Sequence, residues 1–110
     1  MNILFLCTAN IHRSRTAEDY FRETESDTYT FLSAGLSEKE CNRHGSRLCT
    51  VELLEWADKV LVMEEMHRDR IAQHTGTRFL DKIQVVGIED IYKYKQPELI
   101  VLLKEKIWFS

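Results

Sequence analysis

The fold of this 110-residue chain is decided by residues 3–14, which read ILFLCTANIHRS. Residues 3–6 are a continuous apolar run, which is typical of a strand buried on both faces. Residues 13–24 then carry apolar side chains at helical spacing. A short loop that joins a strand to a helix N-terminus offers backbone N–H groups and a partial positive charge to an anion. The segment therefore predicts an anion-binding loop over residues 7–13.

Two reactive side chains stand at the ends of this loop. A phosphate group in the loop would meet Cys7 at one end and Arg13 at the other, where the planar guanidinium can hold two oxygens at once. The helix N-terminus, Arg13 and the hydroxyl of Ser14 would all favour the thiolate form of Cys7, which is a nucleophile at neutral pH. The alternative is a buried, inert Cys7 and a surface Arg13. The strand before Cys7, the serine after Arg13 and the immediate helix favour the catalytic interpretation.

The rest of the chain alternates between strand and helix patterns. Such alternation predicts right-handed β-α-β crossovers and a parallel sheet that is covered on both faces. Ligands of such sheets bind outside the carboxyl ends of the strands, so site residues should follow strands. No linker or repeat is visible, so we expect one domain over residues 1–110. Further strands are expected over 29–33, 59–63 and 82–86. Further helices are expected over 47–56, over 64–74 and from Pro97 onward. The first of these helices could instead begin later, with Thr50 as its cap.

Composition limits the classes of partner. The net charge of −3 argues against duplex binding, which usually needs a basic face, so no nucleic-acid partner is expected. No apolar run approaches the ~20 residues of a membrane span, and the N-terminus lacks the features of a signal peptide. Three cysteines in a chain without export signals predict reduced thiols. We therefore expect a cytoplasmic protein without a membrane partner.

At several places the sequence resembles the low-molecular-weight protein tyrosine phosphatase family. The resemblance begins in residues 3–14 with a cysteine, five residues, an arginine and a serine, and it covers most of the chain. It continues through Ala17-Glu18, Ser33-Ala34-Gly35 and Ala57-Asp58. The resemblance implies a flavodoxin-like three-layer sandwich with a four-stranded parallel sheet and helices on both faces. It also implies phosphate monoester hydrolysis through phosphocysteine without a cofactor or metal, and we expect a monomer or weak dimer.

The resemblance assigns roles within the loop. Cys7 would be the nucleophile and Arg13 the phosphate clamp, while Asn10 would stabilise the loop and Ser14 would donate to the thiolate. Ile11 occupies the position that lines the pocket mouth. A bulky aliphatic there favours a flat aryl phosphoester, whereas arginine-phosphatase relatives carry threonine, so phosphotyrosine on a protein, or a small aryl phosphate, is the expected substrate. The remaining expected phosphate-binding residues are Thr8, Ala9 and His12.

The general acid of the family lies in an Asp-Pro-Tyr segment, for which Asp90-Ile91-Tyr92 is the comparable stretch here. It follows the expected strand 82–86, so it lies at the same sheet edge as Cys7. Asp90 would protonate the leaving oxygen and Tyr92 would wall the pocket. Glu89 is the second candidate for the acid. The missing proline predicts a less rigid loop.

Two further departures from the family pattern affect the site. His12 stands where many members have a second cysteine. Residues 35–46 are short where relatives have a longer loop and helix. This short segment predicts a pocket that lacks one wall and is either open or completed by a partner.

Other functions stay open at this stage. An arsenate reductase would use the same loop but needs two further cysteines close together late in the chain, and Cys41 and Cys49 are early. A catalytically weak module that binds phosphate or phosphoproteins would keep the loop and lack an efficient acid. The spacing of Cys41, His44 and Cys49 fits no common zinc signature, so no metal site is expected.

Overall fold

The computed structural model describes residues 1–25 and 28–109. Its centre is a four-stranded sheet in the order β2-β1-β3-β4, and all three strand pairs are parallel. This order is the one of flavodoxin-like doubly wound sheets, so the predicted fold class is confirmed. The strands are β1 (Asn2–Cys7), β2 (Thr30–Gly35), β3 (Lys59–Val62) and β4 (Ile83–Val85).

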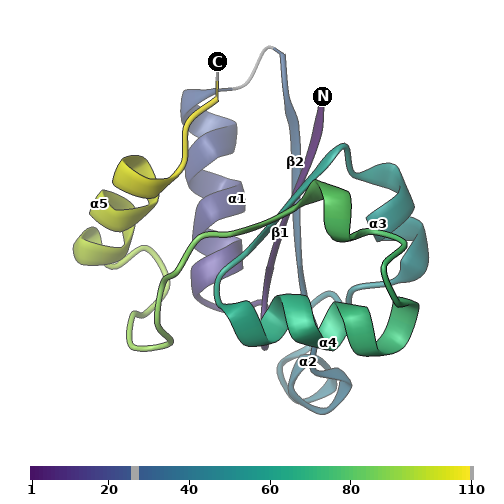
Figure 1. Ribbon diagram of the computed structural model, residues 1–110. Coiled ribbons are helices and arrows are strands. Elements are labelled where there is room, and N and C mark those ends of the chain that lie inside the picture. Colours follow the sequence, from purple (N-terminus) through teal and green to yellow (C-terminus); the bar gives the residue numbers. More distant parts are fainter. Residues whose placement is uncertain (26–27, 110) are drawn as a thin grey trace.

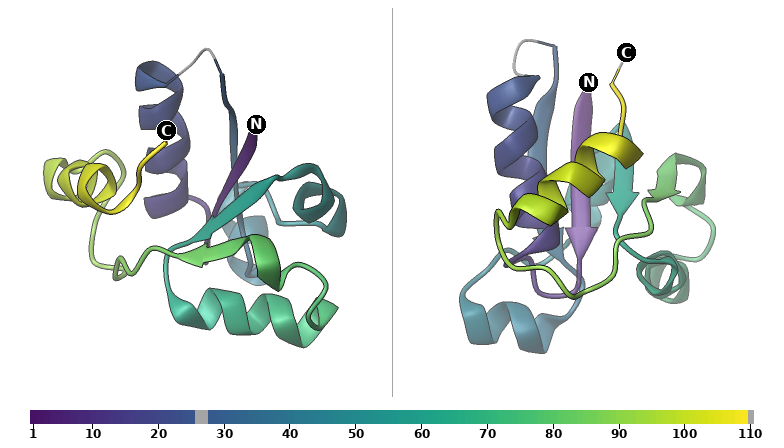
Figure 2. Two further views of the ribbon diagram at one scale, coloured as in Figure 1. Left: turned by 45° about the horizontal axis from the view of Figure 1, so that its top comes forward. Right: turned by 90° about the vertical axis from the view of Figure 1, so that its left-hand side faces the viewer.

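Helices cover both faces of the sheet, which makes the predicted three layers. Figure 1 shows α1 and α5 on one side, α3 and α4 on the other, and α2 at the end where β1 and β2 terminate. The two views of Figure 2 show the same layers. Within the described residues, no helix combines the length and the apolar composition that crossing a membrane requires. The helices are α1 (Arg13–Thr24), α2 (Glu38–His44), α3 (Val51–Trp56), α4 (Glu65–Thr75) and α5 (Pro97–Lys106).

The apolar run in β1 divides the core into two halves. Ile3 and Phe5 face α1 and α5, whereas Leu4 and Leu6 face α3 and α4, and all four are fully buried. The Phe5 ring stacks on Phe21 of α1 at 5.7 Å between centroids. Full burial of each such side chain contributes about 1.5–3 kcal/mol to the stability of the folded protein. This two-sided burial fixes β1 at the centre, so the loop after it lies at the middle of the carboxyl edge.

The structure decides between two expected starts for one helix and differs from expectation in two other elements. The later of the two starts is confirmed: α3 begins at Val51, because Thr50 is its N-cap and accepts a hydrogen bond from the Leu53 N–H at 3.2 Å. The strand expected over 82–86 contains only Ile83–Val85, after a single 3₁₀ turn. Helix α2 was not expected. It ends at His44, and the residue that caps it, Gly45, has a φ of 65°.

Candidate active site

The loop after β1 encloses a small cavity at the N-terminus of α1. The cavity has a volume of about 50 Å³, and Cys7, Arg13 and Asp90 meet at it. Helix α1 has no acidic residue in its first turn, and its N-cap, His12, makes no side-chain capping bond. Its partial positive charge is therefore left for an anion. The other lining residues are Thr8, Ala9, Ile11 and His12, so the structure brings most of the predicted site residues together.

Hydrogen bonds converge on the Cys7 sulfur. The Asn10 backbone N–H donates to Sγ at 3.3 Å, and Ser14 Oγ lies 2.9 Å from Sγ. Ser14 Oγ accepts a hydrogen bond from the Asn10 side-chain amide at 2.9 Å, and its own hydrogen has two acceptors within reach, the sulfur and the Ala34 carbonyl at 3.4 Å. Donors to sulfur stabilise the negatively charged form of a thiol. The loop therefore directs a backbone N–H and a hydroxyl at the Cys7 sulfur.

Asn10 holds the loop in a conformation that is uncommon for a residue with a side chain. Its φ is 57°, in the left-handed region that asparagine tolerates better than most residues. Its second amide hydrogen bonds Ser33 Oγ at 2.8 Å, and Ser33 donates to the buried Glu18 carboxylate at 2.6 Å. Both amide hydrogens of Asn10 are thus used, which fixes its side chain. The sequence analysis assigned no role to Glu18 or Ser33 beyond their place in the family resemblance.

Arg13 is held so that part of its guanidinium remains available. The side chain is only 1 % exposed, and its Nη1 donates to Glu64 Oε2 at 2.7 Å and to the Ile88 carbonyl at 2.8 Å. Its Nε is buried and has no hydrogen-bond acceptor, although Asp90 Oδ1 lies 3.7 Å away. An unpaired buried donor is costly unless a ligand accepts from it. A phosphate oxygen would satisfy this donor.

Asp90 faces the cavity from the loop between β4 and α5. Its carboxylate is 63 % exposed and lies at the open side of the cavity, near Arg13. Tyr92 is partly buried against the core and lines a wider outer cavity of about 550 Å³ together with Ile11 and Asp90. Glu89, the second candidate for the acid, lines neither cavity. The geometry therefore favours Asp90 over Glu89.

Helix α2 forms a wall of the outer cavity. Glu40 and His44 line it, and they form an ion pair at 3.6 Å when His44 is protonated. The helix is tied to the loop because the Ser37 N–H donates to the Thr8 carbonyl at 3.0 Å and Ser46 Oγ donates to the Ala9 carbonyl. The short segment 35–46 thus supplies part of the cavity lining, and the expectation that the pocket is open or completed by a partner stays a prediction.

Two residues near the site were missed by sequence reasoning, Glu64 and His67. His67 is 2 % exposed; its Nδ1 accepts from the Glu64 N–H at 2.9 Å, and its Nε2 lies 3.0 Å from Thr8 Oγ1. Burial, and next the nearby Arg13, lower the pKa of His67 to about 4, so the ring is neutral at pH 7. A neutral ring that accepts at Nδ1 carries its hydrogen on Nε2 and donates it to Thr8. Both residues follow β3, so the strand-end rule could have identified them.

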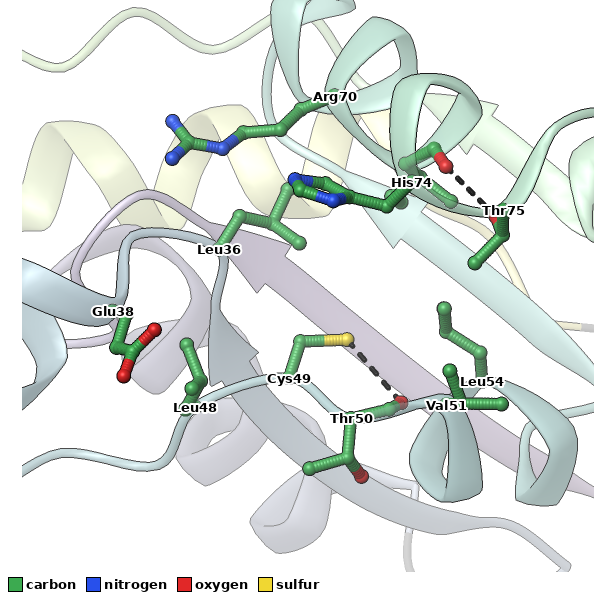
Figure 3. Close-up of a pocket in the computed structure, with 11 residues that line it drawn as sticks. Leu36, Glu38, Leu48, Cys49, Thr50, Val51, Leu54, Arg70, His74 and Thr75 are labelled. Carbon is green, nitrogen blue, oxygen red and sulfur yellow. Dashed lines mark hydrogen bonds between the residues drawn. The ribbon is translucent and has the colours of Figure 1, made fainter.

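A second hollow lies between α3 and α4, away from Cys7. It has a volume of about 280 Å³, and Figure 3 shows Cys49 at its floor with Leu36, Arg70 and His74 around it. Burial, and next Cys41, raise the pKa of Cys49 to about 12, so this thiol is protonated at neutral pH and poorly suited to a disulfide relay. In the described part of the chain, no three His, Cys, Asp or Glu side chains are grouped to hold a metal ion.

Comparison with known proteins agrees with the geometry. No family model matches the chain. It is 33 % identical to the protein-arginine-phosphatase of Bacillus subtilis (strain 168), over 96 % of this chain and 93 % of that protein. Its fold resembles that of a YwlE arginine phosphatase mutant with a phosphorylated active-site serine. The two chains are 26 % identical, the match covers 96 % of this chain and 92 % of that one, and the TM-score is 0.70. The fold also resembles that of the low-molecular-weight protein tyrosine phosphatase from T. tengcongensis. Here the identity is 24 %, the match covers 96 % of this chain and 91 % of that one, and the TM-score is 0.69. The chain belongs to the low-molecular-weight protein tyrosine phosphatase family.

Proposed function

We propose that this chain hydrolyses phosphate monoesters on proteins through a phosphocysteine at Cys7. One observation carries the proposal: the cavity at the α1 N-terminus has a hydrogen-bonded cysteine sulfur at one side and an unpaired, buried arginine Nε at the other. The similarity to a protein-arginine-phosphatase, and to a YwlE mutant with a phosphorylated active-site serine, supports covalent chemistry at this position. The reduced cysteines suit the cytoplasm as its compartment.

In the first step, the Cys7 thiolate attacks the phosphorus atom and the bond from phosphorus to the leaving oxygen breaks. Arg13 Nε and the backbone N–H groups of the loop hold the non-bridging oxygens as charge develops on them. Asp90, as a carboxylic acid, gives its proton to the leaving oxygen. The products are phosphocysteine, a neutral hydroxyl on the leaving group, and the Asp90 carboxylate.

In the second step, water attacks the phosphocysteine. The Asp90 carboxylate takes a proton from this water, the S–P bond breaks, and the thiolate and inorganic phosphate are released. The hydrogen bonds from Ser14 and from the Asn10 N–H stabilise the sulfur as it leaves with a negative charge. Phosphate, as the product, should inhibit by occupying the same loop.

The mouth of the cavity favours an aryl phosphate. Ile11 and Tyr92 line the outer cavity with Ile91, whose side chain is 68 % exposed. A flat phenyl ring can pack between such apolar groups while its phosphate reaches the loop. We therefore propose phosphotyrosine, or a close aryl phosphate, as the substrate class.

Phosphoarginine is the second candidate, because the chain is 33 % identical to a protein-arginine-phosphatase. A phosphorylated guanidinium carries several N–H donors, which a carboxylate or hydroxyl at the mouth could accept. Glu40 of α2 lines the outer cavity and offers such a carboxylate. Ile11 opposes this candidate, since its side chain has no acceptor.

The mechanism is tested by hydrolysis of 4-nitrophenyl phosphate without added metal. Turnover should vanish in Cys7→Ser and fall at least 100-fold in Asp90→Asn, because general acid catalysis contributes roughly 10²–10⁴-fold. Phosphate binding without Cys7-dependent turnover would overturn the enzyme proposal in favour of a phosphate-binding module. Equal rates of the native chain and Asp90→Asn would remove Asp90 from its role.

The substrate is tested with two peptides of the same sequence, one with phosphotyrosine and one with phosphoarginine. The native chain should release phosphate faster from the phosphotyrosine peptide. Ile11→Thr should shift the ratio of the two kcat/KM values toward phosphoarginine, because the threonine hydroxyl adds an acceptor and shortens the side chain. Faster release from the phosphoarginine peptide by the native chain would establish the second candidate instead.

A further inference from the structure

The loop that carries Asp90, residues 86–96, contains no helix or strand, yet both its ends are fixed. At its start, the Gly87 and Ile88 N–H groups donate to the Met63 carbonyl at 3.0 and 2.8 Å, and the Ile88 carbonyl accepts from Arg13. Ile88 is fully buried. The first end of the loop is therefore anchored to Met63, which directly follows β3, and to the phosphate clamp.

The second end is anchored to the first turns of α1. The Tyr94 N–H donates to His12 Nδ1 at 3.1 Å, and the Lys95 N–H donates to Thr16 Oγ1 at 2.9 Å. The Tyr94 hydroxyl hydrogen-bonds the Asp19 carboxylate. Lys95 has a φ of 56°, a conformation that costs a non-glycine residue about 1–2 kcal/mol and persists only where neighbours enforce it.

His12 connects this loop to the nucleophile. The residue lies in the phosphate loop next to Arg13, and it lines the same small cavity as Cys7 and Asp90. Because Nδ1 accepts the Tyr94 N–H, the neutral ring carries its own hydrogen on Nε2. One side chain thus joins the loop that holds the nucleophile to the loop that holds the general acid.

We propose, resting on the phosphatase function above, that His12 is a positioning residue that holds the Asp90 loop over the cavity through the Tyr94 N–H. His12 acts on the proton transfer to the leaving group and not on phosphate binding. In the described structure no side-chain hydrogen bond fixes the Asp90 carboxylate, and its one ion-pair contact, with Arg13 Nε, is long at 3.7 Å. Its position over Cys7 therefore depends on the two anchored ends of its loop.

The test measures kcat/KM for a series of aryl phosphates, from 4-nitrophenyl to unsubstituted phenyl phosphate. A mispositioned acid slows poor leaving groups most, since these need the proton most. In His12→Leu, we expect kcat/KM for phenyl phosphate to fall at least 10-fold and that for 4-nitrophenyl phosphate to fall less than about 3-fold. The inhibition constant of inorganic phosphate should stay unchanged.

Two conservative variants separate the anchor from a general effect on folding. Asparagine carries an acceptor oxygen close to the position of Nδ1, whereas glutamine carries its acceptor near the position of Nε2. His12→Asn should therefore restore the native dependence on leaving group, and His12→Gln should behave as His12→Leu. Glu23→Ala is a matched control. It removes the exposed ion pair at 3.6 Å between Lys95 of the same loop and Glu23 of α1, and it should leave the dependence of kcat/KM on the leaving group unchanged.

In His12→Leu, kcat/KM could instead fall by the same factor for every leaving group while phosphate inhibits more weakly. That result would show that His12 contacts phosphate, and it would overturn the proposal. The double variant gives a second check. If adding His12→Leu to Asp90→Asn made kcat/KM depend still more steeply on the leaving group, the proposal would also be overturned, because two changes that act through one group should not add. Hydrogen exchange of the Tyr94 amide gives a readout without turnover: it should accelerate in His12→Leu and not in Glu23→Ala. An absence of Cys7-dependent turnover, with Tyr94 exchange as expected, would refute the phosphatase function and leave only the anchor.

Discussion

Acidification should destabilise the fold through His67, a ring that the structure holds neutral beside the active site. The imidazole is buried, its Nδ1 accepts the Glu64 N–H, and its Nε2 donates to Thr8 Oγ1. A second proton would place a hydrogen on Nδ1 against the Glu64 N–H. Burial lowers the pKa of His67 from 6.5 to about 4, and the charge of Arg13 is the next cause. Arg70 lowers the pKa further, whereas the carboxylates of Glu64 and Asp90 raise it.

The direction and size of the effect follow from linkage. Between pH 6.5 and about pH 4, the unfolded chain protonates this histidine and the folded chain does not, so the free energy of unfolding falls as the pH falls. The contribution is fully present above pH 6.5 and is lost by about pH 4. Each pH unit in this window corresponds to about 1.4 kcal/mol, so lowering the pH from 7 to 4.5 should remove on the order of 2–3 kcal/mol.

Urea unfolding of the native chain and of His67→Gln, each at pH 7 and at pH 4.5, measures this contribution. Glutamine is neutral at both values, so the variant keeps every other titration and loses only this one. The native chain should lose about 2–3 kcal/mol more than the variant over this range. The comparison uses only the change with pH, so any destabilisation of the variant at pH 7 cancels. An equal loss in both proteins would refute the reasoning.

Three other substitutions have defined expectations. In Gly35→Ala, the new β-carbon would lie 2.5 Å from Cys41 Sγ and 2.7 Å from a phosphate-loop carbonyl, so urea unfolding should show a loss of about 1–3 kcal/mol; unchanged stability would contradict this packing. Ser14→Ala removes the hydroxyl 2.9 Å from the sulfur of Cys7, the proposed nucleophile. Alkylation by iodoacetate at pH 7 should slow about 10-fold, as expected for a lost hydrogen bond to a charged group. An unchanged rate would assign the hydroxyl no part in stabilising a Cys7 thiolate. Thr50→Ala removes the α3 cap and should cost about 1 kcal/mol with unaltered kcat, whereas a fall in kcat would link α3 to the site.

Most of the fold could be predicted because apolar periodicity decides it. The run over residues 3–6 is buried on both faces, and this places β1 at the centre of the sheet. Helix α2 was missed because only Cys41 of its seven residues is buried, so it shows no apolar period. The signals that could have identified it are at its ends: Ser37 accepts from the Glu40 N–H, and Gly45 follows the last turn.

Part of the site could be predicted because parallel strands bring their carboxyl ends to one edge. The family resemblance singled out Asp90, and this rule then placed it at the same sheet edge as Cys7, across 83 residues of sequence. The contacts of Glu64 and His67 could not be read in the same way. Their partners, Arg13 and Thr8, lie 51 and 59 residues away, and the choice of partner depends on side-chain directions that a sequence pattern does not contain.

The Asp90 loop shows how contacts distant in sequence can replace a local constraint. A proline before Tyr92 would have stabilised the loop by about 0.4–1 kcal/mol, by restricting the unfolded chain. Here three hydrogen bonds to α1, made by Tyr94 and Lys95, connect residues 75 to 82 positions apart. At the lower end of the usual range, about 0.5 kcal/mol each, they together exceed the contribution of a proline. The consequence differs in kind, because a proline orders the loop by itself, whereas these bonds order it only when α1 is folded. Asp90, the proposed general acid, is therefore in place only in molecules whose phosphate loop and α1 N-terminus are already formed.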